Sequence, residues 1–306
     1  MAGTESMRIG VIGLGSMGLG IACSLVRAGF ATKGYDLNAD AVRKFAEAGG
    51  LPAESATDAA HGVDALVVAV VNAAQANAIL FNEGAAASGI NPGGVILSCA
   101  TMSPHHAREL AQSAKALGFL YLDAPISGGA VKAAQGQLTV MASGEPEAFE
   151  RAQPVLDAMA GTVHRLGDEA GLGASYKMIN QLLAGVHIAA ACEALTFAAR
   201  LGLDLPTVFK VITGSAGNSW MFENRGPHIL EGDYAPRSAI DIFTKDLGIV
   251  SDMGRLEKFP LQLSTTALQM FIATAAAGMG RDNDASVARM LAQLTGVALP
   301  GPAQKE

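Results

Sequence analysis

A glycine-rich turn between a predicted strand and a predicted helix constrains this chain more than any other feature. Residues 8–12 are an apolar run typical of a short buried strand, and residues 19–28 form a helical pattern that Gly29 ends. The turn has the pattern Gly-x-Gly-x-x-Gly, and its residues are Gly13, Leu14, Gly15, Ser16, Met17 and Gly18. In dinucleotide-binding folds the first glycine permits the bend, the second lets the backbone approach a pyrophosphate, and the third allows close helix–strand packing. The pattern predicts a dinucleotide site with the pyrophosphate at the helix N-terminus.

A carboxylate follows this turn at the spacing that ribose recognition needs. The second apolar run, residues 30–35, ends at Asp36. A carboxylate there accepts hydrogen bonds from the ribose diol of NAD and repels the 2′-phosphate of NADP, so NAD is the predicted cofactor. Glycine-rich turns are common, and the alternative is an ordinary strand–turn–helix. The strand before the turn, the helix after it and the acid beyond favour the dinucleotide interpretation.

Composition narrows the class of protein and its partners. The chain of 306 residues is long enough for two domains, and its net charge of −7 argues against nucleic acid and anionic membranes as partners. Charged residues make up only 16% of the chain, which suggests that some surface is buried between subunits. The odd number of cysteines and their spacing fit neither a disulfide framework nor a zinc site, and they predict a reducing, cytoplasmic location. The cysteines are Cys23, Cys99 and Cys192.

Membrane and targeting segments are not predicted. No uninterrupted apolar stretch reaches transmembrane length. Residues 9–26 lack charge and could imitate a signal-peptide core, but five glycines interrupt them and no basic region precedes them.

Strands and helices alternate through the first half of the chain. Predicted strands lie at residues 64–70, 94–98, 119–123, 137–142 and 162–166, with helices at 38–48, 74–81, 104–117 and 146–159. This alternation predicts an α/β Rossmann domain, a doubly wound and mostly parallel sheet, over residues 1–166. Ligands of such sheets bind beyond the carboxyl ends of the strands, so a site is expected at the glycine turn, Asp36 and residues 71–72, 98–101 and 123–129.

The pattern changes after Leu166. A glycine-rich junction at residues 167–173 precedes a predicted helix over residues 174–200, about 40 Å long at ~1.5 Å per residue. Further helices are predicted at residues 206–213, 220–230, 238–256, 261–277 and 284–294. Residues 167–306 are therefore predicted to form an all-helical domain for substrate binding and oligomerisation.

Polar residues gather at the start of the long predicted helix. One face carries, at helical spacing, Lys177, Asn180, Gln181, Ala184 and Ile188. We expect the lysine to face the cleft between the domains. Oxidation of an alcohol by NAD requires a proton to leave the hydroxyl, and a lysine whose pKa is lowered by desolvation can accept it. On helical position alone, the favoured alternative is a lysine that extends to solvent.

Four motifs in order support the catalytic interpretation. They are the glycine turn, Asp123-Ala124-Pro125-Ile126-Ser127-Gly128-Gly129, Gly173-x-x-x-Lys177-x-x-Asn180-Gln181 and Lys245-Asp246-Leu247. Over nearly the whole chain this order resembles the β-hydroxyacid dehydrogenase family, which includes 3-hydroxyisobutyrate dehydrogenase and tartronate semialdehyde reductase. Residues 70–75, 179–188 and 215–225 resemble its L-threonate dehydrogenase branch. The resemblance implies NAD-linked oxidation of a short hydroxy acid, here L-threonate to 2-dehydro-L-erythronate.

The resemblance also implies roles for individual residues. Lys177 is the family's catalytic lysine and Asn180 orients the substrate, while Thr101 and Lys245 match positions near the nicotinamide half of the cofactor. The substrate loop is Ser127, Gly128 and Gly129. That turn offers a hydroxyl and successive N–H groups to a carboxylate, although a flexible turn is an equal alternative from the residues alone.

Some residues depart from the family pattern or invite other interpretations. Asn72 replaces an apolar-proline pair common in relatives and is predicted as a cofactor or ribose contact, although such an Asn is usually a turn residue. Ser98 and Ala100 leave Thr101 as the expected side-chain contact from their loop. His105 and His106 lack further ligands at metal spacing, so no metal is predicted. His187 and Glu193 are interpreted as ordinary polar residues of a helix. The residues interpreted either as part of the core or as the wall of a substrate pocket are Trp220, Phe222 and Arg225.

Three alternatives to L-threonate oxidation remain open. One is activity on 3-hydroxyisobutyrate or tartronate semialdehyde. Another is an NADP-linked imine or semialdehyde reductase, against which Asp36 and Lys177 argue. The third is a non-catalytic dinucleotide-binding scaffold, which need not retain Lys177, Asn180 and Ser127 together.

The apolar side chains of the long predicted helix point in several directions, and the sheet domain alone cannot cover all of them. They are Ile179, Leu182, Leu183, Val186, Ala189, Ala190 and Leu195. A homodimer or homotetramer formed through the helical domain is therefore predicted.

Overall fold

The computed structural model describes residues 7–82 and 85–301. The chain divides into two compact units, Met1–Lys177 and Met178–Glu306, and the division falls within the long helix α8 (Leu172–Arg200). The predicted domain boundary between residues 166 and 167 stays a prediction.

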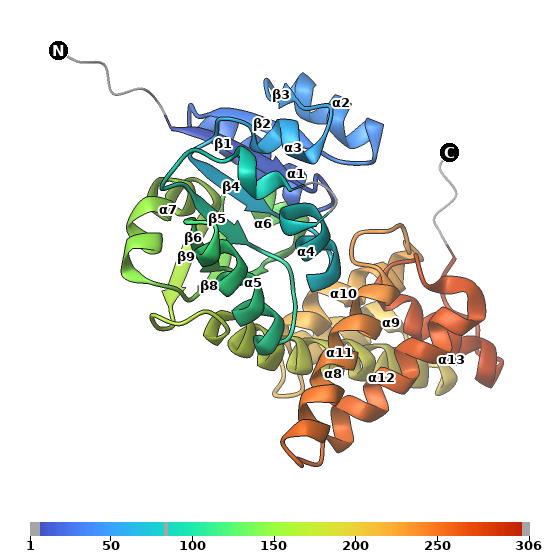
Figure 1. Ribbon diagram of the computed structural model, residues 1–306. Coiled ribbons are helices and arrows are strands. Elements are labelled where there is room, and N and C mark those ends of the chain that lie inside the picture. The colour runs from blue at the N-terminus through green and yellow to red at the C-terminus, as the bar shows by residue number, and fades with distance from the viewer. Residues whose placement is uncertain (1–6, 83–84, 302–306) are drawn as a thin grey trace. The chain divides into compact units, whose positions relative to one another are not determined.

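A six-stranded parallel sheet forms the centre of the first unit (Figure 1). Its strands are β1 (Arg8–Ile12), β2 (Ala31–Tyr35), β3 (Leu51–Pro52), β4 (Ala65–Val68), β5 (Val95–Ser98) and β6 (Leu120–Asp123). They lie in the order β3-β2-β1-β4-β5-β6, and every neighbouring pair is parallel. The order reverses between β1 and β4, which is the switch point where open α/β sheets bind ligands. The predicted doubly wound sheet is confirmed.

Helices cover both faces of this sheet. They are α1 (Gly18–Arg27), α2 (Ala39–Glu47), α3 (Ala56–Ala60), α4 (Ala73–Phe81), α5 (Pro104–Ala116) and α7 (Pro146–Met159), with a 3₁₀ turn at Ala86–Gly89. On one face, Val11 and Leu97 pack with residues of α1 and α7. On the other, Leu66 and Ile96 pack with residues of α3, α4 and α5. Alternate strand residues thus face opposite cores, which explains the continuous apolar runs.

The two last predicted strands of the first half do not join the main sheet. β8 (Leu138–Ala142) and β9 (Ala160–Arg165) form a second sheet with β7 (Ile126–Ser127), in the order β7-β8-β9. β7 pairs antiparallel with β8, and β8 pairs parallel with β9. Pro125, just before β7, has no N–H for a ladder, and its carbonyl accepts from Met141 at 2.9 Å, so the chain turns back after β6. This local reversal is what the strand–helix alternation could not predict.

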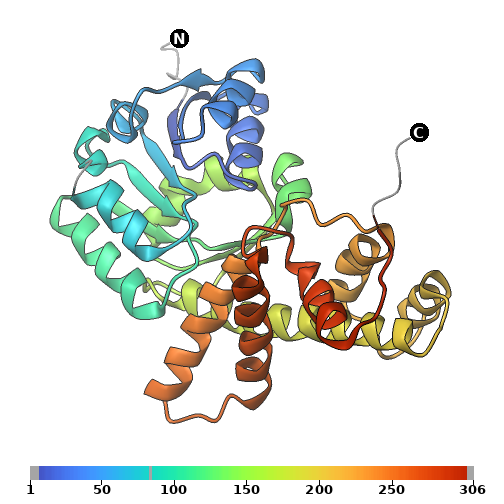
Figure 2. The ribbon, with the colours of Figure 1, turned by 90° about the vertical axis from the view of Figure 1, so that its right-hand side faces the viewer.

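The second unit is helical, as predicted (Figure 2). After α8 come α9 (Leu205–Thr213), α10 (Trp220–Glu231), α11 (Ile240–Leu256), α12 (Gln262–Thr274) and α13 (Val287–Thr295). Its core joins residues of α8, α11 and α12, and the rings of Phe243 and Phe271 stack 5.2 Å apart. The predicted helix at residues 261–277 ends earlier, because α12 passes into a π-helical segment, Ala275–Met279, where Gly278 has a φ of 87°.

One face of α8 carries exposed apolar side chains. They are Leu172, Tyr176, Ile179, Leu183 and Phe197. Of the residues predicted for a subunit interface, Ile179 and Leu183 are exposed, whereas Ala189 and Leu195 pack in the core of their own unit. A homodimer or homotetramer stays a prediction.

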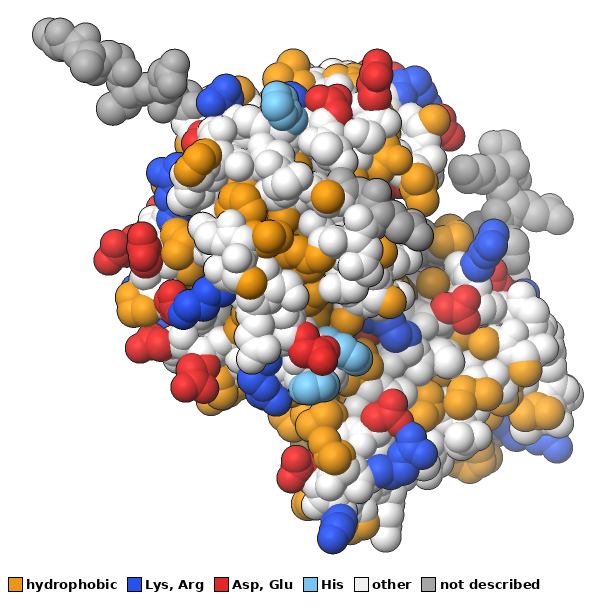
Figure 3. All heavy atoms as spheres, viewed as in Figure 1, with side chains coloured by type: hydrophobic (Ala, Val, Ile, Leu, Met, Phe, Trp, Pro, Cys, Tyr) orange, Lys and Arg blue, Asp and Glu red, His pale blue; other side chains and the backbone are white. Residues whose placement is uncertain are grey.

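Among the described residues, α8 is also the one helix long and apolar enough to cross a membrane by length and composition. The prediction concerned uninterrupted apolar stretches, and α8 meets the criterion on average hydropathy because polar residues interrupt it. Half of its most apolar stretch is buried inside the protein, as in a core helix. On the face shown in Figure 3, acidic and basic side chains are interspersed among apolar ones.

Candidate active site

The three glycines of the turn after β1 meet different surroundings. Gly13 has a φ of 93°, and a Cβ atom there would lie 2.6 Å from the carbonyl oxygen of Ala69. A Cβ atom at Gly18 would lie 1.9 Å from the carbonyl oxygen of Gly13. At Gly15, by contrast, a Cβ atom would meet no described atom within 4 Å apart from those of Gly15 and its two chain neighbours. The fold requires the first and third glycines, whereas the second leaves open space of the kind that a pyrophosphate needs beside the backbone.

The N-terminus of α1 suits the same anion. Its cap residue, Met17, makes no side-chain capping hydrogen bond, and the first turn carries no acidic residue. The first N–H groups of a helix and its dipole favour negative charge, and here no side chain competes for them. The residues present therefore fit a dinucleotide.

Asp36 joins the end of β2 to this turn. Its Oδ2 accepts a hydrogen bond from the backbone N–H of Leu14 at 2.6 Å, and its Oδ1 accepts one from Asn38 at 2.8 Å. The half-buried carboxylate is therefore held in one orientation beside the glycine turn. Each carboxylate oxygen has more than one lone pair, so both still have capacity for ribose hydroxyls.

Asn72 has a clear structural role at the start of α4. Its Oδ1 accepts from the N–H of Gln75 at 2.8 Å, and the Gln75 Oε1 accepts from the N–H of Val71 at 3.0 Å. This reciprocal arrangement caps the helix, which agrees with the simpler interpretation of a turn residue. A cofactor contact by Asn72 stays a prediction, as does one by the half-buried Thr101 in the segment after β5.

The predicted substrate loop lies at the end of β7. Gly128 and Gly129 have φ values of 134° and 76°, and both conformations favour glycine. Gly129 is exposed and begins the short helix α6 (Gly129–Ala134), which no side chain caps. Ser127, half-buried, precedes them. A hydroxyl and backbone N–H groups are thus close together on an accessible loop.

A buried acid that belongs to one of the four motifs, but for which the sequence predicted no role of its own, fixes the start of α8. Asp123, at the end of β6, is 1% exposed. Its Oδ2 accepts from the N–H groups of Gly171 and Ala174, each at 2.9 Å, and from the Ser143 hydroxyl at 3.3 Å. A carboxylate at a helix N-terminus stabilises it. Asp123 therefore anchors the turn of α8 that precedes Lys177, and the sequence signal was an acid at a buried strand end.

Burial gives Asp123 a measurable pH dependence. Desolvation raises its pKa to about 6, although its three hydrogen bonds act in the opposite direction. An unfolded Asp titrates near pH ~4, so between ~4 and ~6 the folded protein binds the extra proton and loses stability as the pH rises. In Asp123→Asn this slope should disappear. The unfolding free energies of wild type and variant should then differ by about 2 kcal/mol more at pH 4 than at pH 7, with the wild type relatively more stable at pH 4.

Urea unfolding at both pH values measures this difference. Asp168→Asn, at an exposed carboxylate of the same unit, serves as the matched control. If the unfolding free energies of wild type and Asp123→Asn differ by the same amount at both pH values, this titration does not belong to Asp123.

The predicted catalytic residues follow along α8. Lys177 is 6% exposed, and Asn180, half-buried, lies three positions further on the same helix. Lys245 belongs to α11, where its Nζ forms an ion pair with Oδ1 of Asp246 at 2.7 Å. Lys177 is therefore not a lysine that extends to solvent, and its catalytic role stays a prediction.

Comparisons with known proteins decide the family. Residues 8–167 match the NAD binding domain of 6-phosphogluconate dehydrogenase, and residues 171–291 match the family described as NAD-binding of NADP-dependent 3-hydroxyisobutyrate dehydrogenase. The chain belongs to the β-hydroxyacid dehydrogenase family. It is an oxidoreductase that acts on a hydroxy acid with an NAD-type cofactor.

Individual relatives cover nearly the whole dehydrogenase. An L-threonate dehydrogenase of Escherichia coli O6:H1 is 50% identical over 97% of this chain and 98% of its own. One of Cupriavidus necator is 50% identical over 98% of this chain and 100% of its own. The crystal structure of a 3-hydroxyisobutyrate dehydrogenase from Salmonella typhimurium, 50% identical, aligns with a TM-score of 0.89 over 93% of this chain and 100% of that chain.

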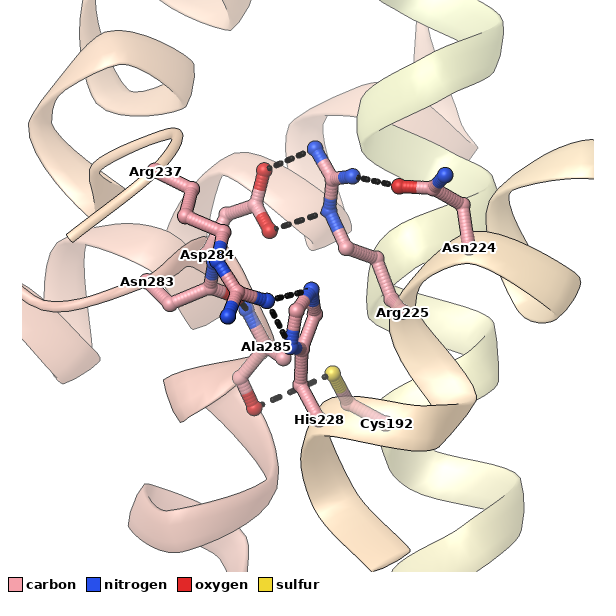
Figure 4. A network of polar contacts seen from close by, with 8 residues as sticks. All are labelled: Cys192, Asn224, Arg225, His228, Arg237, Asn283, Asp284 and Ala285. Carbon is pink, nitrogen blue, oxygen red and sulfur yellow. Dashed lines mark hydrogen bonds and ion pairs between the residues drawn. The ribbon is translucent and has the colours of Figure 1, made fainter. Parts of the chain in front are cut away.

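The aromatic and arginine residues of α10 stabilise the dehydrogenase's helical unit. The ring of Phe222 stacks on Phe209 at 5.6 Å. Arg225 binds the fully buried Asp284 through two bonds, Nε to Oδ1 at 2.6 Å and Nη2 to Oδ2 at 2.8 Å (Figure 4). Phe222 and Arg225 thus belong to the interior of this unit, while Trp220 is exposed.

The histidine pair has local partners. His105 Nε2 lies 3.2 Å from a Glu109 carboxylate oxygen, and His106 Nδ1 lies 3.0 Å from the Ser103 hydroxyl. Within the described ranges, no group of three or more His, Cys, Asp or Glu residues is placed to hold a metal ion.

Proposed function

We propose that this dehydrogenase oxidises L-threonate to 2-dehydro-L-erythronate with NAD, and that Lys177 is its general acid/base. The proposed substrate rests on the difference in sequence identity between this chain and relatives that act on different substrates. L-threonate dehydrogenases share about half of the residues, whereas the 2-(hydroxymethyl)glutarate dehydrogenase of Eubacterium barkeri is 32% identical and the NAD-dependent L-serine dehydrogenase of Pseudomonas aeruginosa 30%. The higher the identity across the whole chain, the more of the polar contacts that set specificity are retained, which favours a shared substrate.

The reaction removes a hydride from C2 of the substrate and a proton from the hydroxyl on C2. Bound NAD supplies the hydride acceptor. Lys177, as the neutral amine, takes the hydroxyl proton while the carbonyl forms, and passes it on to solvent. In the reverse direction the ammonium returns the proton to the oxygen.

The remaining proposed roles rest on the family resemblance, and the geometry of the glycine turn and of the Ser127 loop supports them. Ser127, Gly128 and Gly129 are proposed to hold the substrate carboxylate through the hydroxyl and N–H groups, and Asn180 to orient the substrate beside Lys177. Proposed cofactor contacts are the turn residues Gly13, Leu14, Gly15, Ser16, Met17 and Gly18. Asp36 is proposed to bind the ribose and Asn72 to be a further cofactor or ribose contact, while Thr101 and Lys245 are proposed to lie nearer the nicotinamide. The three free cysteines support the proposed cytoplasmic location.

A substrate panel with NAD tests the proposal. L-threonate should give the highest kcat/KM, at least about tenfold above 3-hydroxyisobutyrate, glycerate and the other four-carbon aldonates, because buried polar groups left unpaired penalise the wrong substrate. Tartronate semialdehyde is assayed in the reducing direction with NADH.

The second candidate is 3-hydroxyisobutyrate, since the Salmonella structure at 50% identity carries that name. A higher kcat/KM for 3-hydroxyisobutyrate or tartronate semialdehyde than for L-threonate would reject the proposed substrate. NAD binding without turnover of any hydroxy acid would favour the scaffold instead.

A further inference from the structure

A polar relay links α8 to α11 within the helical unit. The Asn180 Nδ2 donates to Gln181 Oε1 at 2.8 Å, and the Gln181 Nε2 donates to Asp246 Oδ2 at 2.5 Å. Gln181 is 7% exposed and Asp246 is 2% exposed. Lys245 pairs with the other carboxylate oxygen at 2.7 Å. A buried, charged group thus stands at one end of the relay and the proposed substrate residue at the other.

Close packing holds the two helices at this point. A Cβ atom at Gly185 would lie 2.8 Å from a methyl carbon of Leu247, which follows Asp246 on α11. Gly185 lies one turn beyond Gln181 on α8. The helices therefore approach closely beside the relay, and a buried side chain in such packing keeps one rotamer.

The carboxylate of Asp246 fixes the direction of both hydrogen bonds in the relay. An ionised carboxylate only accepts hydrogen bonds, so the Gln181 amide must present its NH₂ group to Asp246. Its oxygen then faces Asn180, whose own NH₂ group must donate. The two ends of an amide have nearly the same shape, and here the carboxylate decides which end points where.

We infer that Gln181 and Asp246 are positioning residues that fix the amide of Asn180 with its carbonyl oxygen available to the substrate. This inference rests on the proposed role of Asn180 beside the substrate. An amide oxygen accepts from a hydroxyl and offers nothing to a methyl group or a carboxylate. The relay therefore selects a substrate with a hydroxyl next to the reacting carbon, which is the class of polyhydroxy acids.

Gln181→Met tests the relay, because methionine has a similar length and no hydrogen-bonding amide. We expect its kcat/KM for L-threonate to fall by about tenfold to a hundredfold, the effect of losing one buried hydrogen bond. For 2-hydroxybutyrate of the same C2 configuration, which lacks the neighbouring hydroxyl, kcat/KM should stay unchanged. Gln262→Met, the same exchange at an exposed position of the helical unit, should alter neither.

A measurement without turnover separates the relay from the proposed function. Hydrogen exchange of the Asn180 side-chain NH₂ group, followed by ¹⁵N NMR and assigned with Asn180→Ala, should become about tenfold faster in Gln181→Met. Asp246→Asn keeps the size of the side chain and should accelerate it in the same direction, which covers the case that Gln181→Met does not fold. If wild type does not oxidise L-threonate, the proposed function fails and the exchange rates still decide the relay.

Two results would overturn the inference. One is an equal loss on both substrates with unchanged exchange, which would show a merely structural role. The other is a substrate preference and an exchange rate in Gln181→Met that both stay within about twofold of wild type.

Discussion

Replacing Lys177 with alanine is expected to lower kcat for L-threonate by ~10²–10⁴, the usual contribution of a positioned general acid/base. The affinity for NAD should stay close to that of wild type, because the glycine turn and Asp36 are untouched. The lysine is buried on α8 one turn after the segment that Asp123 holds, so its amine has little freedom to move away. Steady-state kinetics with a separate titration of NAD binding measures both quantities.

Two further variants at the same position separate proton transfer from packing. Lys177→Met keeps a long apolar side chain in the buried space and removes the amine, so it should be as slow as alanine. Lys177→Arg keeps the positive charge but cannot give up a proton near neutral pH, so it should also be slow. An alanine variant that keeps more than about a third of wild-type kcat would end the assignment.

The Rossmann unit was predictable because its signals are local. The spacing of Gly13, Gly15 and Gly18 is a short motif that can be read from the sequence, although the crowding at Gly13 comes from Ala69 on a neighbouring segment. Long helices with a regular apolar period, such as α8, were predicted for the same reason. Two-residue strands such as β3 and β7 carry no period to detect, so the separate second sheet was not predicted.

The supporting residues of the site were harder to predict, because their partners are distant in the sequence. Asp123 binds the N–H groups of residues about fifty positions later, and Gln181 binds Asp246 sixty-five positions later. A single sequence gives the type of residue but not the contact. Asn72 illustrates the converse, since its capping bond to Gln75, three positions away, agrees with the turn residue that the sequence offered as the simpler interpretation.

Asp36 should make kcat/KM with NAD exceed that with NADP by ~10² or more. Both carboxylate oxygens are oriented by backbone N–H groups, from Leu14 and Asn38, so the charge cannot swing away from a 2′-phosphate. Juxtaposed like charges cost several kcal/mol, and each 1.4 kcal/mol corresponds to about a factor of ten. Kinetics with both cofactors at saturating L-threonate gives the ratio.

Asp36→Asn tests the charge without removing the side chain. The amide keeps an oxygen that can accept from Leu14, so the glycine turn should hold its shape, and the preference for NAD should fall by about tenfold. Asp36→Ala also removes the bond to Leu14 and should weaken the binding of both cofactors. Asp40→Asn, at an exposed carboxylate of α2, is the control for a general change in surface charge. Equal efficiency of the wild type with NAD and NADP would show that Asp36 serves only to hold the turn.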